Sequence, residues 1–502
     1  MFPEGMHTER KEANLSIALL GNRIHCDQTL VEYLIEFLLV FASAKDRSGE
    51  GKLRFHTQTE LLEGKTNYYV NVNAALRRFI FYNNCKQESR SVIDDKANQA
   101  HWNYLRDTAC DGTDDIDLIH DLLHSYTIVT RNRGWYAQAL LPVSPELLLP
   151  DLQGIKARQK DGANWDLDGN EVDDKFIFDK HNFLARGGQM LYLHLLQGLQ
   201  YSDEAGLDDR SAIEALLRNM LQDAGNKVAL LADFVQQEWE CHRQNPLPLK
   251  SYTMGYVQDG FSIRAERFVQ EVRNFLSCDI HPIARIELLS QGLVLSLLRA
   301  MHVAAAHRIS PDTPEPLWIM DMSDMGGTSN IAKLSAASYR AAYDSFLSAM
   351  SIIYDTQGRP AEERFKSLQD GKKESADIFK NLAKEMKLVI PSRGSYERFS
   401  LPEPLARYLV LSLIKPDTKM TLDTFLERLY DHFRIVIAPA QYRQAVSESN
   451  WHESENMADY FDINARCFQD FLKQCGFLRD LSDATAIVVN PYQEVVIHET
   501  AC

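Results

Sequence analysis

The stretch "PIARIELLSQGLVLSLLRAM", residues 282–301, indicates the class of the fold. Its apolar side chains recur every three or four positions, which is the period of an α-helix and brings them onto one face. Pro282 stands near the predicted start, where a helix tolerates proline best. The run therefore predicts a long helix that packs on other helices through one stripe, made of Ile283, Ile286, Leu289, Leu293, Leu297 and Met301.

The helical period continues on both sides of this stretch, and we expect a central helical bundle over residues 151–390. Within it, Ser211 and Glu214 have the spacing of a capping box, in which each side chain binds the backbone of the other at a helix start. Further helices are predicted at about 331–353 and 373–387. Pro and Gly residues interrupt the period at 142–170 and 308–330, where we expect breaks between units.

Residues 1–150 combine helical and strand-like pieces. Helices are predicted at about 27–45 and 114–126, and two short β-rich pieces, "KLRFHT" (52–57) and "NYYVNV" (67–72), lie between them. This region is therefore predicted to be a mixed α+β domain. With 502 residues the chain is too long for one compact core, so we expect roughly two to four domains in a mainly α, multidomain protein.

Charge and cysteine content restrict the partners and the compartment. A formal net charge of −16 argues against a grip on nucleic acid along the whole chain and against a basic membrane contact. The eight cysteines include no CxxC pair, which excludes a zinc ribbon and favours a reducing cytoplasm. The most apolar run, 30–44, contains Glu32 and Glu36 and is shorter than the roughly 20 residues of a membrane span. A cytoplasmic protein without a membrane partner is expected.

The last hundred residues, 395–502, form the clearest unit. Two amphipathic helices, the second capped by Thr421, are followed by a third with Asp462 as its predicted cap. The run "FLRDLSDATAIVVNPY" then alternates like a β-hairpin. Three helices followed by a hairpin resemble a winged-helix domain, and the resemblance implies that the third helix faces the partner.

The charges of the third predicted helix favour a protein partner over DNA. A helix that enters the major groove must be cationic. Residues 395–502 contain ten Lys plus Arg and sixteen Asp plus Glu, a net charge of −6. We expect this unit to dock another protein, and its candidate contact residues are Arg466, Phe468 and Lys473. A structural role as a C-terminal cap on the bundle stays open.

Two patterns suggest metal binding. His120 and His124 lie one helical turn apart with Asp121 beside the first, so they are candidate ligands in a metal-dependent hydrolase or nuclease. The stretch "NWDLDGNEVDDKF" (164–176) begins like a calcium loop. It has Glu171 and Ile177 where the glycine and the bidentate glutamate belong, so a solvated turn is favoured.

Two further patterns suggest anion or nucleic-acid binding. "RNRGWYAQ" groups cations with rings that could stack on bases, so its residues Arg131, Arg133, Trp135 and Tyr136 are candidate contacts in a DNA-binding regulator. Gly187 and Gly188 at a predicted helix start could hold an anion with Arg186, or simply allow a tight turn. The chain has no GxxxxGK[ST], no helix-opening GxGxxG and no GxSxG, so no cofactor is expected.

The stretch "HNFLARGGQMLYLHLLQGL" (181–199), together with the C-terminal unit, resembles uncharacterised accessory proteins of prokaryotic anti-phage defence islands. The resemblance implies a cytoplasmic complex with a motor ATPase, a nuclease or a modification enzyme, in which the chain contacts DNA only within the complex. Since no catalytic motif is complete, we expect a non-catalytic scaffold or adaptor subunit. The alternatives are a metal-dependent enzyme using the histidine pair and a DNA-binding regulator.

Overall fold

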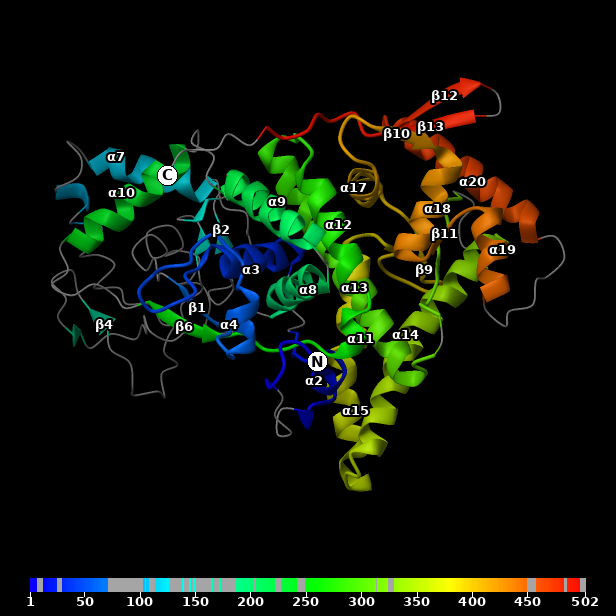
Figure 1. Cartoon of the computed structure of the whole chain (residues 1–502), viewed down its shortest axis with the longest axis horizontal. Helices are drawn as coiled ribbons and strands as arrows, with labels where there is room; N and C mark the ends of the chain where they lie inside the picture. The colour runs from blue at the N-terminus through cyan, green and yellow to red at the C-terminus, as the bar shows by residue number, and fades with distance from the viewer. Residues whose placement is uncertain are drawn as a thin grey trace.

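The computed structural model describes most of the chain, with gaps. The described residues are 1–6, 12–24, 29–70, 103, 105–107, 113–125, 138–139, 144–145, 148–149, 164–165, 171–172, 186–201, 204–221, 227–241, 249–312, 314–323, 329–448, 457–482 and 485–496. Over these residues the fold is mainly helical with a few small sheets, as the sequence predicts (Figure 1).

The helix predicted first, α13 (Pro282–Ile309), lies at the centre of the molecule (Figure 1). It packs against α3 (Leu30–Ala42), α11 (Asp259–Ser262), α14 (Asn330–Thr356) and α17 (Glu403–Leu413). Among the described helices, α13 alone is long and apolar enough to cross a membrane, and 94% of its most apolar window is buried inside the protein. Those properties are equally those of a core helix.

Close contacts at glycines bring the helices together. Gly292 of α13 faces the ring of Tyr408 on α17, and a Cβ there would lie 2.0 Å from the ring atom Cε2. At the start of α8 (Gly187–Tyr201), a Cβ on Gly188 would lie 2.4 Å from the carbonyl oxygen of Tyr33 on α3. Only glycine permits these approaches, because any other side chain would need the facing helix to move away.

One side of the bundle joins residues that lie far apart in the sequence. Helix α3 packs on α8, and α8 packs on α12 (Ala265–Leu276). Strand β1 (Asn67–Val70) pairs antiparallel with β6 (Lys250–Thr253). One apolar core therefore includes residues on both sides of the boundaries expected at 150 and 390–395. Helix α2 (Leu15–Leu20) instead packs on α13 and α14. The remaining elements of this part of the chain are α4 (Gln58–Leu62), α7 (Thr113–Ser125), β2 (Gln138–Ala139), β3 (Leu148–Leu149), β4 (Asn164–Trp165), β5 (Glu171–Val172), α9 (Glu204–Leu221) and α10 (Lys227–Cys241).

Helix α14 leads away from the centre, and the chain after it turns back and forms a second layer. The returning elements are the short helix η3 (Ala361–Glu363), α15 (Arg364–Lys373), α16 (Ala376–Glu385), β8 (Val389–Ile390) and β9 (Arg398–Phe399). Both α15 and α16 pack on α14. The helix predicted at about 373–387 is α16, and a turn at residues 374–375 separates it from α15, which was not predicted.

The C-terminal elements gather at one end of the molecule (Figure 1). After α17 come β10 (Lys419–Thr421), α18 (Leu422–Phe433), β11 (Ile435–Val436), α19 (Pro439–Glu448), α20 (Met457–Gln474), β12 (Leu478–Ser482) and β13 (Thr485–Val489). The three-stranded sheet has the order β10-β13-β12, all antiparallel. Strand β11 pairs in parallel with β7 (Trp318–Ile319), and this pairing connects the C-terminal elements to the loop that follows α13.

Of the two helix starts predicted from capping residues in α9 and α18, only that of α18 is confirmed. Thr421 caps α18 as predicted, because its hydroxyl accepts the Thr424 N–H at 3.2 Å. Ser211 is not a cap and lies inside α9, where Glu214 instead accepts the Phe55 N–H at 2.9 Å. That bond also explains why 52–57 is no strand: the backbone of Phe55 binds a helix side chain.

The predicted cap Asp462 also lies inside its helix, since α20 begins at Met457. The earlier turn is held by packing: Phe461 is buried and stacks on Tyr442 of α19, with ring centroids 4.5 Å apart. A burial contact between two helices thus outweighs the local capping preference of an Asp side chain.

Candidate functional site

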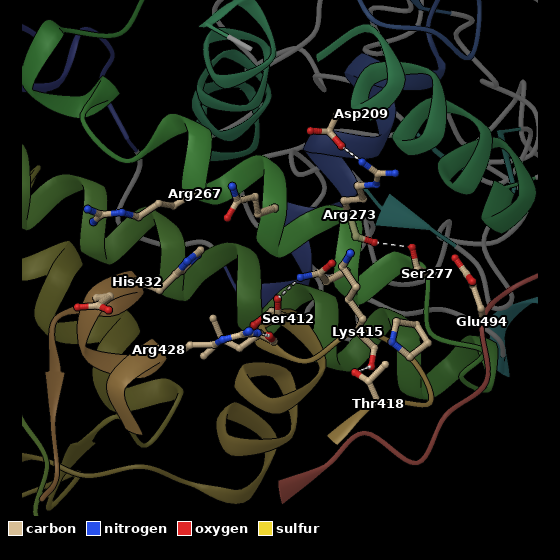
Figure 2. Close-up of a pocket in the computed structure, with 15 residues that line it drawn as sticks. Asp209, Arg267, Arg273, Ser277, Ser412, Lys415, Thr418, Arg428, His432 and Glu494 are labelled. Carbon is tan, nitrogen blue, oxygen red and sulfur yellow. Dashed lines mark hydrogen bonds and ion pairs between the residues drawn. The ribbon is translucent and has the colours of Figure 1, made fainter. Parts of the chain in front are cut away.

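A groove of about 920 Å³ lies between α12 and the C-terminal unit (Figure 2). One wall is a single face of α12, since its lining residues are spaced three or four apart: Arg267, Gln270, Arg273, Asn274 and Ser277. The turn after α17 and helix α18 form the other wall. The turn contributes Lys415 and Thr418, and α18 contributes Arg428, Asp431 and His432.

The end of α17 forms the groove's floor. A helix end leaves its last carbonyl groups without partners inside the helix. Here the side-chain amide of Asn274 donates to the Ser412 carbonyl at 2.8 Å, and Arg428 Nη1 donates to the Leu413 carbonyl at 2.9 Å. Both walls therefore meet through hydrogen bonds to α17, and the cation of Arg428 lies at the negative end of the helix dipole.

The segment after β13 closes one side of the groove. It runs back over α17 toward the bundle (Figure 1). The Val495 N–H donates to the Ser277 carbonyl at 2.8 Å, and the Asp279 N–H donates to the Gln493 carbonyl at 2.8 Å. This pairing places the carboxylate of Glu494 among the lining groups.

The cations of the groove differ in how they are neutralised. Arg267 forms an ion pair with Glu315 at 2.6 Å. Arg273 pairs with Asp209 and, at 3.3 Å, with Asp208. Lys415 and Arg428 have no carboxylate within ion-pair distance among the described residues. The uncompensated positive charge is thus concentrated beside the end of α17.

The hydroxyl groups of the groove are not arranged as nucleophiles. Ser277 Oγ donates to the Arg273 carbonyl at 2.8 Å, and Thr418 Oγ1 donates to the Lys415 carbonyl at 2.7 Å. His432 directs Nε2 to the Glu271 carboxylate at 2.9 Å instead of to a hydroxyl. An activated hydroxyl needs a base within hydrogen-bond reach, so this geometry supports binding better than covalent catalysis.

Beneath the groove, buried charges fasten α18 to α12. Arg264 donates to Glu271 at 3.1 Å and to the His432 carbonyl at 2.8 Å, and its guanidinium stacks 5.2 Å from the ring centre of Phe433. Burial alone would raise the pKa of Glu271. The hydrogen bond from His432 and the charge of Arg264 bring that pKa below its ordinary value, so the carboxylate is ionised.

A second buried arginine extends this network toward the centre. Arg299 of α13 lies 4.5 Å from the ring centre of Trp318 and donates to the Pro316 carbonyl at 2.9 Å. Glu315 approaches both Arg264 and Arg299 to 4.0 Å. Burial lowers the pKa of Arg299 well below its ordinary value, and the nearby charge of Arg264 acts in the same direction. The network therefore fixes α12, α13 and α18 in one arrangement.

The predicted metal ligands lie on α7 but are not joined by a third ligand in the described residues. His120 Nδ1 lies 3.4 Å from Asp121 Oδ1, and Asp121 is exposed. His124 belongs to the same helix. Among the residues that the structure describes, no group of three or more His, Cys, Asp or Glu side chains is arranged to hold a metal ion.

Two other predicted sites lie partly or wholly outside the described residues. The four candidate nucleic-acid contacts Arg131, Arg133, Trp135 and Tyr136 are not among the described residues. Of the stretch that begins like a calcium loop, only residues 164–165 and 171–172 are described, and there Trp165 in β4 pairs with Glu171 in β5.

The predicted anion at the start of α8 is supplied by the protein itself. Glu36 of α3 accepts the Gly188 N–H at 2.7 Å and the Arg186 N–H at 2.9 Å. These N–H groups are therefore already occupied by a carboxylate of the protein itself. The left-handed backbone at this helix start belongs to Arg186 (φ 66°), and Gly187 and Gly188 instead allow the close approach of Tyr33. Burial raises the pKa of Glu36 to about 7, although the backbone hydrogen bonds act to lower it.

The predicted docking residues on α20 divide into two kinds. Arg466 and Lys473 are exposed, and Lys473 forms an ion pair with Asp480 of β12 at 2.8 Å. Phe468 is buried and stacks on Phe425 of α18, so it belongs to the core and is not accessible to a partner. The helical period already places Phe468 inward, next to Phe471 and Leu472.

Comparison with known proteins finds no matching family model, no similar curated protein and no similar solved structure. The groove itself carries no sequence signal, since its residues come from segments that are more than a hundred positions apart. Its function must therefore be inferred from its own geometry and charge.

Proposed function

We propose that this chain is a non-catalytic scaffold or adaptor subunit that docks another protein through a winged-helix-type unit at residues 395–502. The order of the elements supports the winged-helix assignment. A helix, a strand and a second helix are followed by a third helix and a hairpin, and the first strand joins the hairpin in the sheet order β10-β13-β12. Helix α19 is an insertion into this order.

The outward face of α20 is the observation on which the proposal rests. It exposes two large apolar side chains, Tyr460 at 37% and Ile463 at 49%. Of its exposed cations, Lys473 is already paired with Asp480, which leaves Arg466. Asp459, Asp462 and Asp470 are also exposed on this helix, so a duplex would be repelled. Exposed apolar side chains among mixed charges suit a protein surface.

The identity of the assembly depends on a different argument. The resemblance of 181–199 to accessory proteins of anti-phage defence islands favours a cytoplasmic prokaryotic complex that acts on DNA. In such a complex the partner would be a motor ATPase, a nuclease or a modification enzyme, and this chain would reach DNA only through it. The proposal for α20 does not depend on which of these is the partner.

The alternative of a metal-dependent hydrolase or nuclease has a direct test. Protein purified without a chelator is analysed for zinc, manganese and iron, beside the variant His120→Ala. Stoichiometric metal that the variant loses would favour the enzyme over the adaptor. A DNA-binding regulator is tested by the salt dependence of binding, because neutralising phosphates makes affinity fall steeply with salt.

The docking proposal is tested with point variants of the full-length protein. A truncated chain would expose the face of α13 that α17 covers, so deletion would confuse misfolding with loss of a contact. Tagged wild type is compared in its native cells with Ile463→Asp and with Leu62→Asp, a control that charges an exposed leucine on α4. A stoichiometric partner lost only with Ile463→Asp supports the proposal. Retention by both variants, or no partner for the wild type, overturns it.

A further inference from the structure

Two cations of the groove lack the ion pairs that their neighbours have. Arg267 and Arg273 are neutralised by carboxylates. Lys415 is exposed and forms no ion pair with any described residue, and Arg428 uses one of its donors on the Leu413 carbonyl. Figure 2 shows these two side chains on either side of Ser412, directed into the groove. Two adjacent cations with free donors suit one anionic group such as a phosphate.

The other groups of the groove offer acceptors. The hydroxyl groups of Ser277 and Thr418 donate to backbone carbonyls, so the two hydroxyl oxygens can accept hydrogen bonds from a ligand. The carboxylates of Asp431 and Glu494 also line the groove and accept hydrogen bonds. A ligand that satisfies them must carry several hydroxyl or amine hydrogens. The described lining contains no Phe, Tyr or Trp, so it has no ring on which a base could stack.

We propose that the groove binds a small phosphorylated polyol, such as a sugar phosphate. Its phosphate lies on Lys415 and Arg428, and its hydroxyl groups donate to Thr418 and Glu494 on the Lys415 side. A volume of about 920 Å³ matches the size of small-molecule pockets in proteins. This inference goes beyond the docking of a partner by α20, and either can fail without the other.

A nucleic-acid backbone fits the same groove less well. A chain of phosphates would have to pass the carboxylates of Asp431 and Glu494, each of which repels it. A single phosphate needs only Lys415 and Arg428, whereas a chain of phosphates would have to extend from them toward a carboxylate on either side. The charges of the groove therefore favour one phosphate over a chain of phosphates.

Binding should stabilise the fold measurably. A ligand that binds only the folded state raises its stability with concentration. The probes for full-length protein are a hexose phosphate, glycerol phosphate, the unphosphorylated hexose, inorganic phosphate and a single-stranded oligonucleotide. Thermal unfolding screens them, and calorimetric titration then gives the dissociation constant of each.

The proposal expects the hexose phosphate to bind at least about tenfold more tightly than inorganic phosphate, and the free hexose to leave the unfolding temperature unchanged. Lys415→Ala and Arg428→Gln should each raise the dissociation constant of the hexose phosphate about tenfold or more. The control Lys419→Ala removes an exposed lysine of β10 outside the groove lining and should leave the constant unchanged. Lys415→Ala is the safer variant, since the Lys415 side chain forms no hydrogen bond or ion pair with any residue that the structure describes.

Three results would overturn the proposal. If inorganic phosphate binds as tightly as the hexose phosphate, the groove recognises an anion and not a polyol. If Lys415→Ala and Lys419→Ala have equal effects, binding is not in the groove. If the oligonucleotide binds most tightly and loses affinity with Lys415→Ala, the groove is a nucleic-acid site.

Discussion

Replacing Glu36 by glutamine should change how the stability of this protein depends on pH. The carboxylate is fully buried between α3 and α8, where it accepts the N–H groups of Gly188 and Arg186. Burial is the largest influence and raises its pKa from 4.5 to about 7, against the lowering effect of those hydrogen bonds. Glutamine has nearly the same shape and no charge, so the variant removes the titration while keeping the packing.

The sign and size follow from proton linkage. Between pH 4.5 and about 7 the folded protein holds a proton on Glu36 that the unfolded chain has already released. Each pH unit in this window lowers the free energy of unfolding by about 1.4 kcal/mol. The window spans about 2.5 units, so the stabilisation present below pH 4.5 and lost as pH rises through 7 is about 3 kcal/mol.

The assay is denaturant unfolding of wild type and Glu36→Gln at a series of pH values from about 4.5 to 8. The free energy of the variant relative to wild type should rise by about 3 kcal/mol across this range. Glu50→Gln, at an exposed position, reports the effect of removing one surface carboxylate. A difference between wild type and Glu36→Gln that stays constant with pH would refute the reasoning. It would mean that the N–H groups of α8 hold the ionised carboxylate without cost.

Three further variants test the packing, each by denaturant unfolding against wild type. Gly188→Ala forces a Cβ to within 2.4 Å of the Tyr33 carbonyl and should lower the free energy of unfolding by about 3 kcal/mol. A loss below about 1 kcal/mol would mean that α3 and α8 move apart easily. Asn464→Ala removes three hydrogen bonds from a fully buried amide and should cost about 2–4 kcal/mol, with Asn464→Asp no better. Arg264→Leu leaves the Glu271 carboxylate with only His432 and Ser296 as partners and should cost about 3–5 kcal/mol. Adding Glu271→Leu should recover part of that loss, and no recovery would contradict a buried ion pair.

Elements with a strong period could be predicted from the sequence, and those set by distant contacts could not. The periodic run at 282–301 is a helix as predicted, although α13 is buried around most of its surface and Ile283 of the expected stripe is 50% exposed. The hairpin at 478–489 shows its alternation directly. The start of α9 could not be found, because Glu214 binds the backbone of Phe55, some 159 positions away. The insertion α19 was missed because its apolar residues are few and its burial comes from α20.

The groove was beyond reach of sequence reasoning for a similar reason. Arg273, Lys415 and Arg428 are each single cations in otherwise ordinary segments, and only the packing of α12 on α17 brings them together. The exposed apolar residues on α20 did leave a signal. Ile463 stands between Asp462 and Asn464 on a helix whose inward stripe is already complete. An apolar residue in excess of the stripe indicates an outward contact.

The contact of Gly292 with Tyr408 also restricts how this protein can change in evolution. The phenol ring rests on a site that only glycine leaves open, so each residue makes the other necessary. Exchange of the C-terminal unit for an unrelated one, by recombination near residue 395, would leave a hole beside α13 as large as the ring. Any other residue at 292 would in turn reject α17. A C-terminal unit exchanged into this chain would therefore have to supply a matching ring at position 408.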